Sequence, residues 1–302
     1  LWTDGSIGAI STADLSVAEL KAFYSGNNEK VTYVEREKNV QTGSNGFAFA
    51  PSKTANGNAI LYINPHTTFY FRPEVQISSE EGLNVYGAVT WGQFFVYQGF
   101  NENCGWMHTS SNVDVADMYA EKIVQKRERL FYEYDKKLIP VIEKDITISY
   151  LENGKLIPKK IKTYFTNNGP IMAKRDGKWI SLKSNNRSMN SLVQSWIRTK
   201  SKGFDDYKKA MDLKANTSNN TVYADNKGNI GYWHGNFIPI RDKNLNWSKV
   251  MDGSTSATQW KGLHEVSETV HLYNPINGWL QNCNSTPYSV AGANSPKKEN
   301  YP

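Results

Sequence analysis

The stretch TGSNGFAFAPSK, from Thr42 to Lys53, decides how the rest of the sequence is interpreted. A small, sharply turning Gly43-Ser44 pair stands directly before an apolar run typical of a β-strand. Gly-Ser pairs are common in turns, and the chain has others at Gly5-Ser6 and Gly253-Ser254. Ser44 is therefore either an ordinary turn residue or the residue at which the chain cleaves itself and begins a new chain.

Gly43 and Ser44 suit autocleavage on chemical grounds. The serine hydroxyl must reach the carbonyl of the preceding residue, and a small residue in a strained turn favours the acyl shift from nitrogen to oxygen. After cleavage Ser44 would carry a free α-amine, which titrates at about pH 8. Such an amine can accept the hydroxyl proton directly or through one water, so one residue would supply both nucleophile and base.

His66 follows a strand-like run at 59–63 in the tripeptide Asn64-Pro65-His66. If the turn over 54–58 joins two neighbouring strands, positions 44 and 66 arrive at the same end of one sheet. His66 is then a candidate partner of Ser44, and the alternative is a loop histidine.

Asn284 lies in the polar segment NCNSTP, residues 282–287. Its side-chain amide can donate to a developing oxyanion, and such a donor is worth about 2.7–4 kcal/mol of the reaction barrier. By itself the segment is more typical of an ordinary polar loop.

Asp114 and Asp117 flank Val115-Ala116. Their spacing favours acids at the start of a helix, which suits the helix dipole, over a calcium site built from two carboxylates and loop carbonyls. The other histidines have no zinc-ligand spacing, and the chain has no G-x-S-x-G elbow of a classical hydrolase triad.

The composition limits which classes of protein this chain can belong to. The 302 residues are 39% hydrophobic and 21% charged, as in ordinary globular proteins. The net charge of +6 is scattered in solvated patterns, so we expect no nucleic-acid partner, and no apolar run is long enough to predict a membrane span. The chain starts with Leu and shows no signal peptide, so we expect a piece of a longer translation product.

The hydrophobic patterns predict a mixed α+β fold with a large, mostly antiparallel sheet system. Hairpins are expected to turn at Asn153-Gly154 and Asp176-Gly177. The runs between Phe47 and Phe100 are apolar enough for a sheet covered on both faces. Helices are expected at 12–25, 114–136 and 188–211, strands at 31–34, 47–50, 59–63, 84–91, 93–100 and within 221–240, and a loop-rich tail from 276.

With these residues in hand, the sequence resembles the penicillin acylase family of N-terminal-nucleophile hydrolases over about residues 44–290. The resemblance rests on blocks in a fixed order: Gly43-Ser44-Asn45, Asn64-Pro65-His66, Trp106 to Glu121, Asn168-Gly169-Pro170, Tyr223 to Tyr232 with Pro239 and Arg241, Trp260 to Gly262, Asn274 to Gly278, and Asn284 to Pro287. In the block Asn168-Gly169-Pro170, Asn168 stands where the family has His.

The resemblance implies an αββα sandwich, present in part. Residues 1–43 would be the end of the α chain or a spacer peptide, and 44–302 the N-terminal part of the β chain with the N-terminal-nucleophile hydrolase domain. It implies hydrolysis of the amide bond of a small N-acyl substrate, a heterodimer with the rest of its own α and β chains after cleavage, and a periplasmic or secreted location. Missing parts of both chains are expected to lie outside these residues.

The resemblance also assigns roles. Ser44 is the nucleophile, its α-amine the base, and Gly43-Ser44 the autoprocessing junction. Asn284 and the backbone N–H of Ser110 are the oxyanion donors. His66 would hydrogen-bond near the nucleophile and orient it, and it favours cephalosporin or acyl-homoserine-lactone substrates over penicillin G.

A structural calcium ion is implied by the carboxylates of Asp114 and Asp117 and the carbonyls of Ala116 and Pro239. The family's later calcium carboxylate would fall near Asn294, where the chain has no acid.

Three points stay open. A disulfide between Cys104 and Cys283 is one, since both lie near oxyanion segments of the family. Tyr70, Phe95 and Tyr97 either line an acyl pocket or pack in the core. The rivals to an active acylase are a non-catalytic β-rich binding protein and an inactive acylase fragment.

Overall fold

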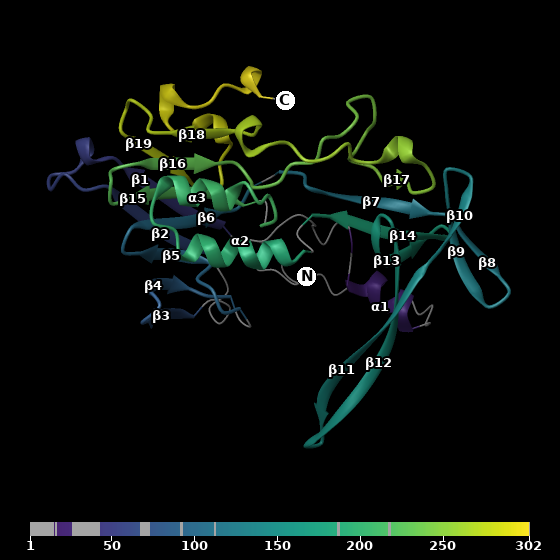
Figure 1. Cartoon of the computed structure of the whole chain (residues 1–302). Helices are drawn as coiled ribbons and strands as arrows, with labels where there is room; N and C mark the ends of the chain where they lie inside the picture. The colour runs from purple at the N-terminus through teal and green to yellow at the C-terminus, as the bar shows by residue number, and fades with distance from the viewer. Residues whose placement is uncertain are drawn as a thin grey trace.

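The computed structural model describes residues 15, 17–25, 43–66, 73–90, 93–111, 113–185, 188–216 and 219–301 (Figure 1). Helix α1, Val17–Ser25, confirms the described part of the first expected helix. The expected strand at 31–34 and Tyr70 lie outside the described residues.

The junction stretch forms the centre of a three-stranded sheet of order β19-β1-β2. Strand β1 is Gly43–Phe49, β2 is Ile60–His66 and β19 is Trp279–Asn282. The register places Gly43 opposite His66, which confirms that the two positions share one end of the sheet. Strand β19 pairs Asn282 with Gly46 and so carries Asn284 to that end, although the sequence predicted only a loop-rich tail there.

A second sheet of seven strands, order β18-β16-β15-β6-β5-β4-β3, packs against the first. The interface contains Ala48 and Leu280 from one sheet and Met107 and Val222 from the other. A Cβ at Gly46 would lie 2.1 Å from Met107 Sδ, so only glycine allows this close approach. The strands are Glu74–Ser79 (β3), Leu83–Ala88 (β4), Gln98–Asn101 (β5), Cys104–Thr109 (β6), Asn220–Asp225 (β15), Ile230–Trp233 (β16) and His271–Tyr273 (β18).

Helices α2 (Met189–Thr199) and α3 (Phe204–Met211) cover the other face of the seven-stranded sheet (Figure 1). Tyr207 and Met211 of α3 join a core cluster with Trp106 and Trp233 of that sheet. The described residues therefore form the ββα part of the expected αββα sandwich. One long helix over 188–211 was expected, but the chain breaks between α2 and α3 at Gly203, whose φ of 147° is open to glycine.

The expected helix at 114–136 is wrong. The segment forms β7 (Ala116–Glu121), β8 (Ile123–Lys126) and β9 (Arg129–Tyr134), and β7 pairs with β14 from Ala116↔Ser184 to Trp179↔Glu121. Buried and half-buried residues alternate along β7, which is the strand period. Of the two acids that suggested a helix start, Asp117 is buried, as is Glu121 at the end of the strand, whereas Asp114 is exposed.

Strand β7 belongs to a third, six-stranded sheet of order β11-β12-β13-β14-β7-β17. Its strands are Ile142–Glu152 (β11), Lys155–Thr166 (β12), Gly169–Arg175 (β13), Lys178–Ser184 (β14) and Met251–Asp252 (β17). Strand β10 (Lys137–Pro140) pairs with β9 in a small sheet beside it. Both expected hairpins are confirmed, with positive φ at Asn153, Gly154, Asp176 and Gly177.

Two expectations about strand extent and burial are wrong in part. The expected strand at 93–100 is regular only from Gln98, and the pair expected within 221–240 ends at Trp233. Strand β6 is buried throughout, but Ile60 and Tyr62 of β2 are exposed, so the first sheet is not covered on both faces within the described part of the chain.

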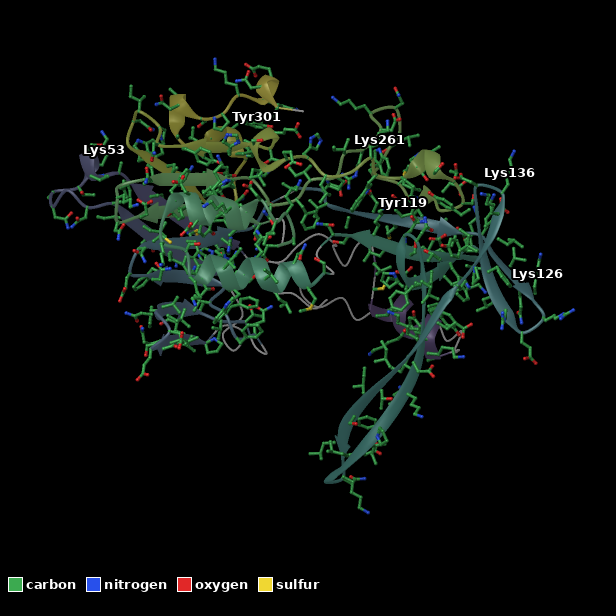
Figure 2. All side chains as sticks on the ribbon, in the orientation of Figure 1. Lys53, Tyr119, Lys126, Lys136, Lys261 and Tyr301 are labelled. Carbon is green, nitrogen blue, oxygen red and sulfur yellow. The ribbon has the colours of Figure 1, made fainter. Side chains whose placement is uncertain are left out.

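Short 3-10 turns complete the described elements, at Pro51–Lys53, Ser256–Thr258, Val266–Glu268, Pro287–Ser289, Gly292–Asn294 and Lys298–Asn300. Lys126 and Lys136 point away from the body at the β8–β10 end, while Lys53 lies at the opposite end, which fits the scattered charge (Figure 2). Among the described residues, no helix is long and apolar enough to cross a membrane.

Candidate functional site

Ser44 is fully buried as the second residue of β1. Its Oγ donates a hydrogen bond of 2.5 Å to the carbonyl oxygen of Gly43, so the hydroxyl lies against the peptide group that precedes it. Its backbone N–H donates to Oδ1 of Asn284 at 3.0 Å.

Gly43 is required by close packing. A Cβ at this position would lie 2.7 Å from Nδ2 of Asn284, which is shorter than side chains tolerate. The amide of Asn284 therefore lies directly over the Gly43-Ser44 peptide.

Ser110 and Asn284, the two oxyanion donors that the resemblance implied, meet at this junction. The backbone N–H of Ser110, just after β6, donates to the same Oδ1 of Asn284 at 3.0 Å. Asn284 follows β19 with a φ of 62°, a left-handed conformation that asparagine adopts more readily than most residues. Ends of three strands from two packed sheets thus converge on one amide.

His66 lies on the other face of the strand pair. It is paired with Gly43, and side chains alternate along a strand, so His66 points to the face opposite Ser44. Its Nε2 lies 2.9 Å from Oδ1 of Asn64 and 3.3 Å from Nδ2 of Asn45. The structure places His66 at the same end of the sheet as Ser44, but the His66 ring contacts Asn64 and Asn45 instead of Ser44.

Two buried asparagines behind the site were not identified from the sequence. Asn220 starts β15 and Asn282 ends β19, and both are fully buried. The only indication of them in the sequence is that each is a polar residue at one end of an apolar strand pattern, Asn220 at the start of its strand and Asn282 at the end of its own. His234 donates toward this pair, with Nδ1 2.6 Å from Oδ1 of Asn220, and burial lowers the pKa of His234 to about 4.

Asp114 and Asp117, the expected calcium ligands, are bridged by Arg241. The guanidinium donates to Oδ2 of Asp117 at 2.9 Å and to Oδ1 of Asp114 at 3.1 Å. Burial raises the pKa of Asp117, and the nearby Arg241 charge opposes this rise. The described residues contain no group of three or more His, Cys, Asp or Glu side chains suited to a metal. As arranged, Asp114 and Asp117 share the Arg241 guanidinium as a counter-charge.

The two implied carbonyl ligands lie in backbone pairings. Ala116 pairs with Ser184, and Pro239 forms an isolated bridge with Leu263.

Asn168, which stands where the family has His, belongs to a buried network around Glu121. Oε1 of Glu121 accepts hydrogen bonds from Thr166 at 2.7 Å, Asn168 at 3.0 Å and Ser181 at 2.6 Å. Burial raises the pKa of Glu121 despite these donors. The network joins β7, β12 and β14 and has a structural role.

The disulfide left open between Cys104 and Cys283 is absent, since both cysteines are free. Cys104 begins β6 and Ser110 follows its end. A strand of this length places Cys104 about 17–20 Å from Ser110. Burial raises the pKa of the Cys104 thiol to about 12. Phe95 and Tyr97 are buried, which favours core packing for both.

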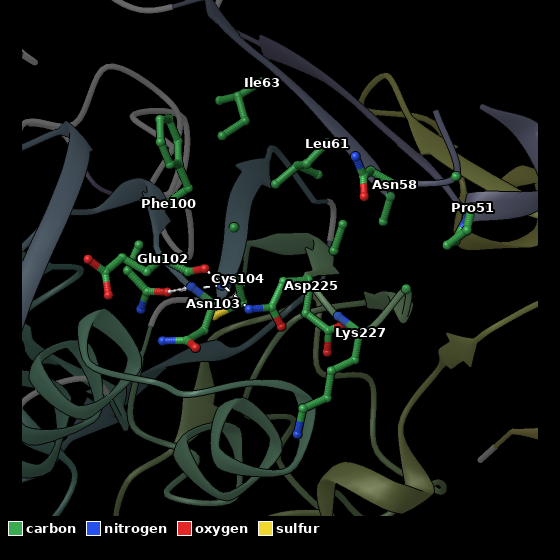
Figure 3. Close-up of a pocket in the computed structure, with 17 residues that line it drawn as sticks. Pro51, Asn58, Leu61, Ile63, Phe100, Glu102, Asn103, Cys104, Asp225 and Lys227 are labelled. Atoms are coloured by element: carbon green, nitrogen blue, oxygen red, sulfur yellow. Dashed lines mark hydrogen bonds between the residues drawn. The ribbon is translucent and has the colours of Figure 1, made fainter. Parts of the chain in front are cut away.

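A cavity of about 420 Å³ lies beside the start of β6 and the end of β15 (Figure 3). Leu61 and Ile63 of β2 face Cys104 and Asp225 across it, and Pro51 closes one side. Ser44, Ser110 and Asn284 are not among the residues that line this cavity.

Comparison with known proteins identifies the family. The sequence profile described as penicillin amidase matches residues 6–301. Acyl-homoserine lactone acylase PvdQ of Pseudomonas fluorescens strain Pf0-1 is 24% identical over 93% of this chain and 42% of its own length. Penicillin G acylase of Escherichia coli is 26% identical over 82% of this chain and 29% of its own length. The chain thus spans less than half the length of either relative.

The fold has a solved counterpart. Thermostable penicillin G acylase from Alcaligenes faecalis superimposes with a TM-score of 0.67 at 21% identity, over 84% of this chain and 47% of that chain. At this identity the match shows that the two share a fold.

Proposed function

The chain belongs to the penicillin amidase family, and on that basis we propose that it carries the nucleophile of an autoprocessed amidohydrolase acting on N-acyl compounds. The observation that supports this most directly is the meeting of Ser44, Ser110 and Asn284 around one half-buried side-chain amide.

Processing would begin at Ser44. Its Oγ attacks the carbonyl carbon of Gly43, the C–N bond breaks, and the nitrogen takes up the proton that Oγ loses, leaving Gly43 as an ester on Ser44 and the nitrogen as a free amine. Water then hydrolyses this ester to give a Gly43 carboxylate and a Ser44 chain with a free α-amine. The contact between Oγ and the Gly43 carbonyl supports this order of events.

Catalysis would use the same atoms. The α-amine takes the proton of Ser44 Oγ as the oxygen attacks the substrate amide carbon. The oxyanion replaces Asn284 Oδ1 at the Ser110 N–H and also accepts from the Asn284 side-chain amide. The amine product leaves with the proton, and water releases the acyl group from Ser44.

The substrate is proposed only as a class. The two relatives named above act on an acyl-homoserine lactone and on penicillin G, which share an amide between an acyl group and a small amine. Because His66 faces away from Ser44, its identity gives no choice between them.

The remaining expectations form part of this proposal. The polypeptide that the relatives have beyond the matched part would complete a heterodimer outside the cytoplasm. Arg241, rather than calcium, would neutralise Asp114 and Asp117.

Intact mass and N-terminal sequencing of the full gene product test the proposal. We expect a chain that starts at Ser44, and we expect Ser44→Ala to remain uncleaved and to lose amidase activity. Ser254→Ala is the matched control, since Gly253-Ser254 is also a Gly-Ser pair. Uncleaved protein in all three samples, with no hydrolysis of a chromogenic acyl amide, would favour the non-catalytic rival.

A further inference from the structure

Asn220 holds several groups of the site at once. Its Nδ2 donates to the carbonyl of Ser110 at 2.9 Å, to Oγ1 of Thr109 at 3.0 Å and to Oδ1 of Asn282 at 3.2 Å. Its Oδ1 accepts from Tyr232 at 2.9 Å and from His234 at 2.6 Å. Asn220 therefore fixes the peptide whose N–H is one proposed oxyanion donor.

Asn282 fixes the turn that carries the other proposed oxyanion donor, the side-chain amide of Asn284. Its Oδ1 accepts the backbone N–H of Asn284 at 2.9 Å and the hydroxyl of Thr109 at 2.5 Å. Its Nδ2 donates to the carbonyl of Ser285 at 3.1 Å. These bonds define the tight turn that carries the Asn284 side chain.

The two asparagines use their hydrogen-bonding capacity in a fully buried setting, where an unmade bond costs about 1–3 kcal/mol. A carboxylate at 220 could not donate to the Ser110 carbonyl, and an apolar residue could neither donate nor accept. The choice of amide at both positions is thus explained by the groups that they hold.

We propose that Asn220 and Asn282 are the positioning residues of the oxyanion site, holding the Ser110 N–H and the Asn284 amide in register. This inference rests on the proposed function. It assigns neither residue a contact with substrate. It predicts that loss of either one weakens transition-state stabilisation without changing substrate affinity, because donors must be placed within about 0.5 Å to be effective.

The experiment uses Asn220→Ala and Asn282→Ala in the processed full-length protein, with Asn236→Ala as the matched control. Asn236 is equally buried and hydrogen-bonded, but its partners are Asn216 and the carbonyl of Met211. We expect kcat to fall by about 10- to 100-fold for the first two variants, with KM within about twofold of wild type. We expect Asn236→Ala to lower only the melting temperature.

Two further variants guard against a misfolded protein. Asn282→Asp keeps the acceptor oxygen for Asn284 and Thr109 but loses the donor to the Ser285 carbonyl, so we expect it to recover part of the activity lost in Asn282→Ala. Thr109→Val removes one hydroxyl from the network and retains the side-chain shape, so we expect an intermediate loss of kcat. A fall in kcat that follows melting temperature across all variants, including Asn236→Ala, would overturn the inference.

Hydrogen exchange separates this inference from the proposed function. If the wild type is neither cleaved nor active, the proposed function fails, but the Ser110 amide still reports its environment. We expect Asn220→Ala to speed exchange at Ser110 by about tenfold or more while the buried amide of Met107 is unchanged. Equal rates at Ser110 in wild type and variant would overturn the positioning role.

Discussion

The junction around Ser44 and the long β11–β12 hairpin are both made of antiparallel strands. Contacts between residues far apart in the chain stabilise the junction, whereas pairing between residues close in the chain stabilises the hairpin. At the junction, the half-buried side chain of Asn284 accepts hydrogen bonds from residues that lie 174 and 240 positions earlier in the chain. In the hairpin each residue pairs with its neighbour across one turn at Asn153-Gly154, and every residue of β11 is exposed. Figure 1 shows this hairpin as an arm that extends away from the packed sheets.

The arm also has a face that nothing described covers. Ile146 pairs with Ile161 and Tyr150 with Ile157, which places these side chains together on one side, and Ile148 joins them. Buried polar contacts therefore give the junction its geometry, whereas turn chemistry and alternation alone give the arm its shape. Mutations should separate the two regions accordingly.

The largest effect is expected at the junction itself. Asn284→Ala removes the proposed side-chain oxyanion donor and should lower kcat by about 10²- to 10³-fold. Steady-state kinetics with an acyl amide would measure this loss. A loss confined to KM would mean that Asn284 binds the ground state rather than the transition state.

Arg241→Ala tests the connection between the two sheet systems. Arg241 follows β16 of the seven-stranded sheet, and Asp117 lies in β7 of the sheet that carries the arm. Removing the guanidinium leaves the buried Asp117 charge unpaired, which should lower the free energy of unfolding by about 3 kcal/mol.

Urea denaturation of Arg241→Ala, with and without a calcium chelator, measures this effect. Lys261→Ala, which loses an exposed pair with Asp242, is the control and should have little effect. If the chelator destabilises wild type as much as the substitution does, calcium rather than Arg241 is the main counter-charge.

The junction should also respond to acid. The pKa of His234 is lowered to about 4, so the folded protein favours the neutral ring while the unfolded chain binds a proton below about pH 6.5. Stability is therefore complete above that pH and is lost as the pH falls toward 4, by at most about 3 kcal/mol. His234→Gln should flatten this part of the profile of unfolding free energy against pH. A variant profile as steep as that of wild type would exclude His234 as its source.

The smallest effect is expected in the arm. Ile148→Lys places a charge on an already exposed strand position, so it should change the free energy of unfolding by less than about 0.5 kcal/mol. The core substitution Ile230→Ala is the contrast and should cost about 2–5 kcal/mol. If Ile148→Lys were destabilising by more than about 2 kcal/mol, the apolar face of the arm would have to be buried against another part of the protein or a partner.

Patterns within a few residues were enough to predict several elements. The Asn153-Gly154 and Asp176-Gly177 turns, the strands around 47–50 and 59–63, and the meeting of positions 44 and 66 all followed from alternation and turn residues. The same local rules failed at 114–136, where acids before bases suggested a helix. Pairing of β7 with β14 overrode that tendency because it buries Tyr119.

The sequence by itself determined the hairpin turns, the strand that begins at the Gly43-Ser44 junction and the family to which the chain belongs. Only the tertiary structure decided that His66 faces away from Ser44, that Arg241 bridges Asp114 and Asp117, and that Asn220 and Asn282 stand behind the oxyanion donors. Turns and alternation depend on neighbours along the chain. Buried hydrogen bonds instead depend on which strand ends the packing of two sheets brings together, and spacing in the sequence does not encode that distance.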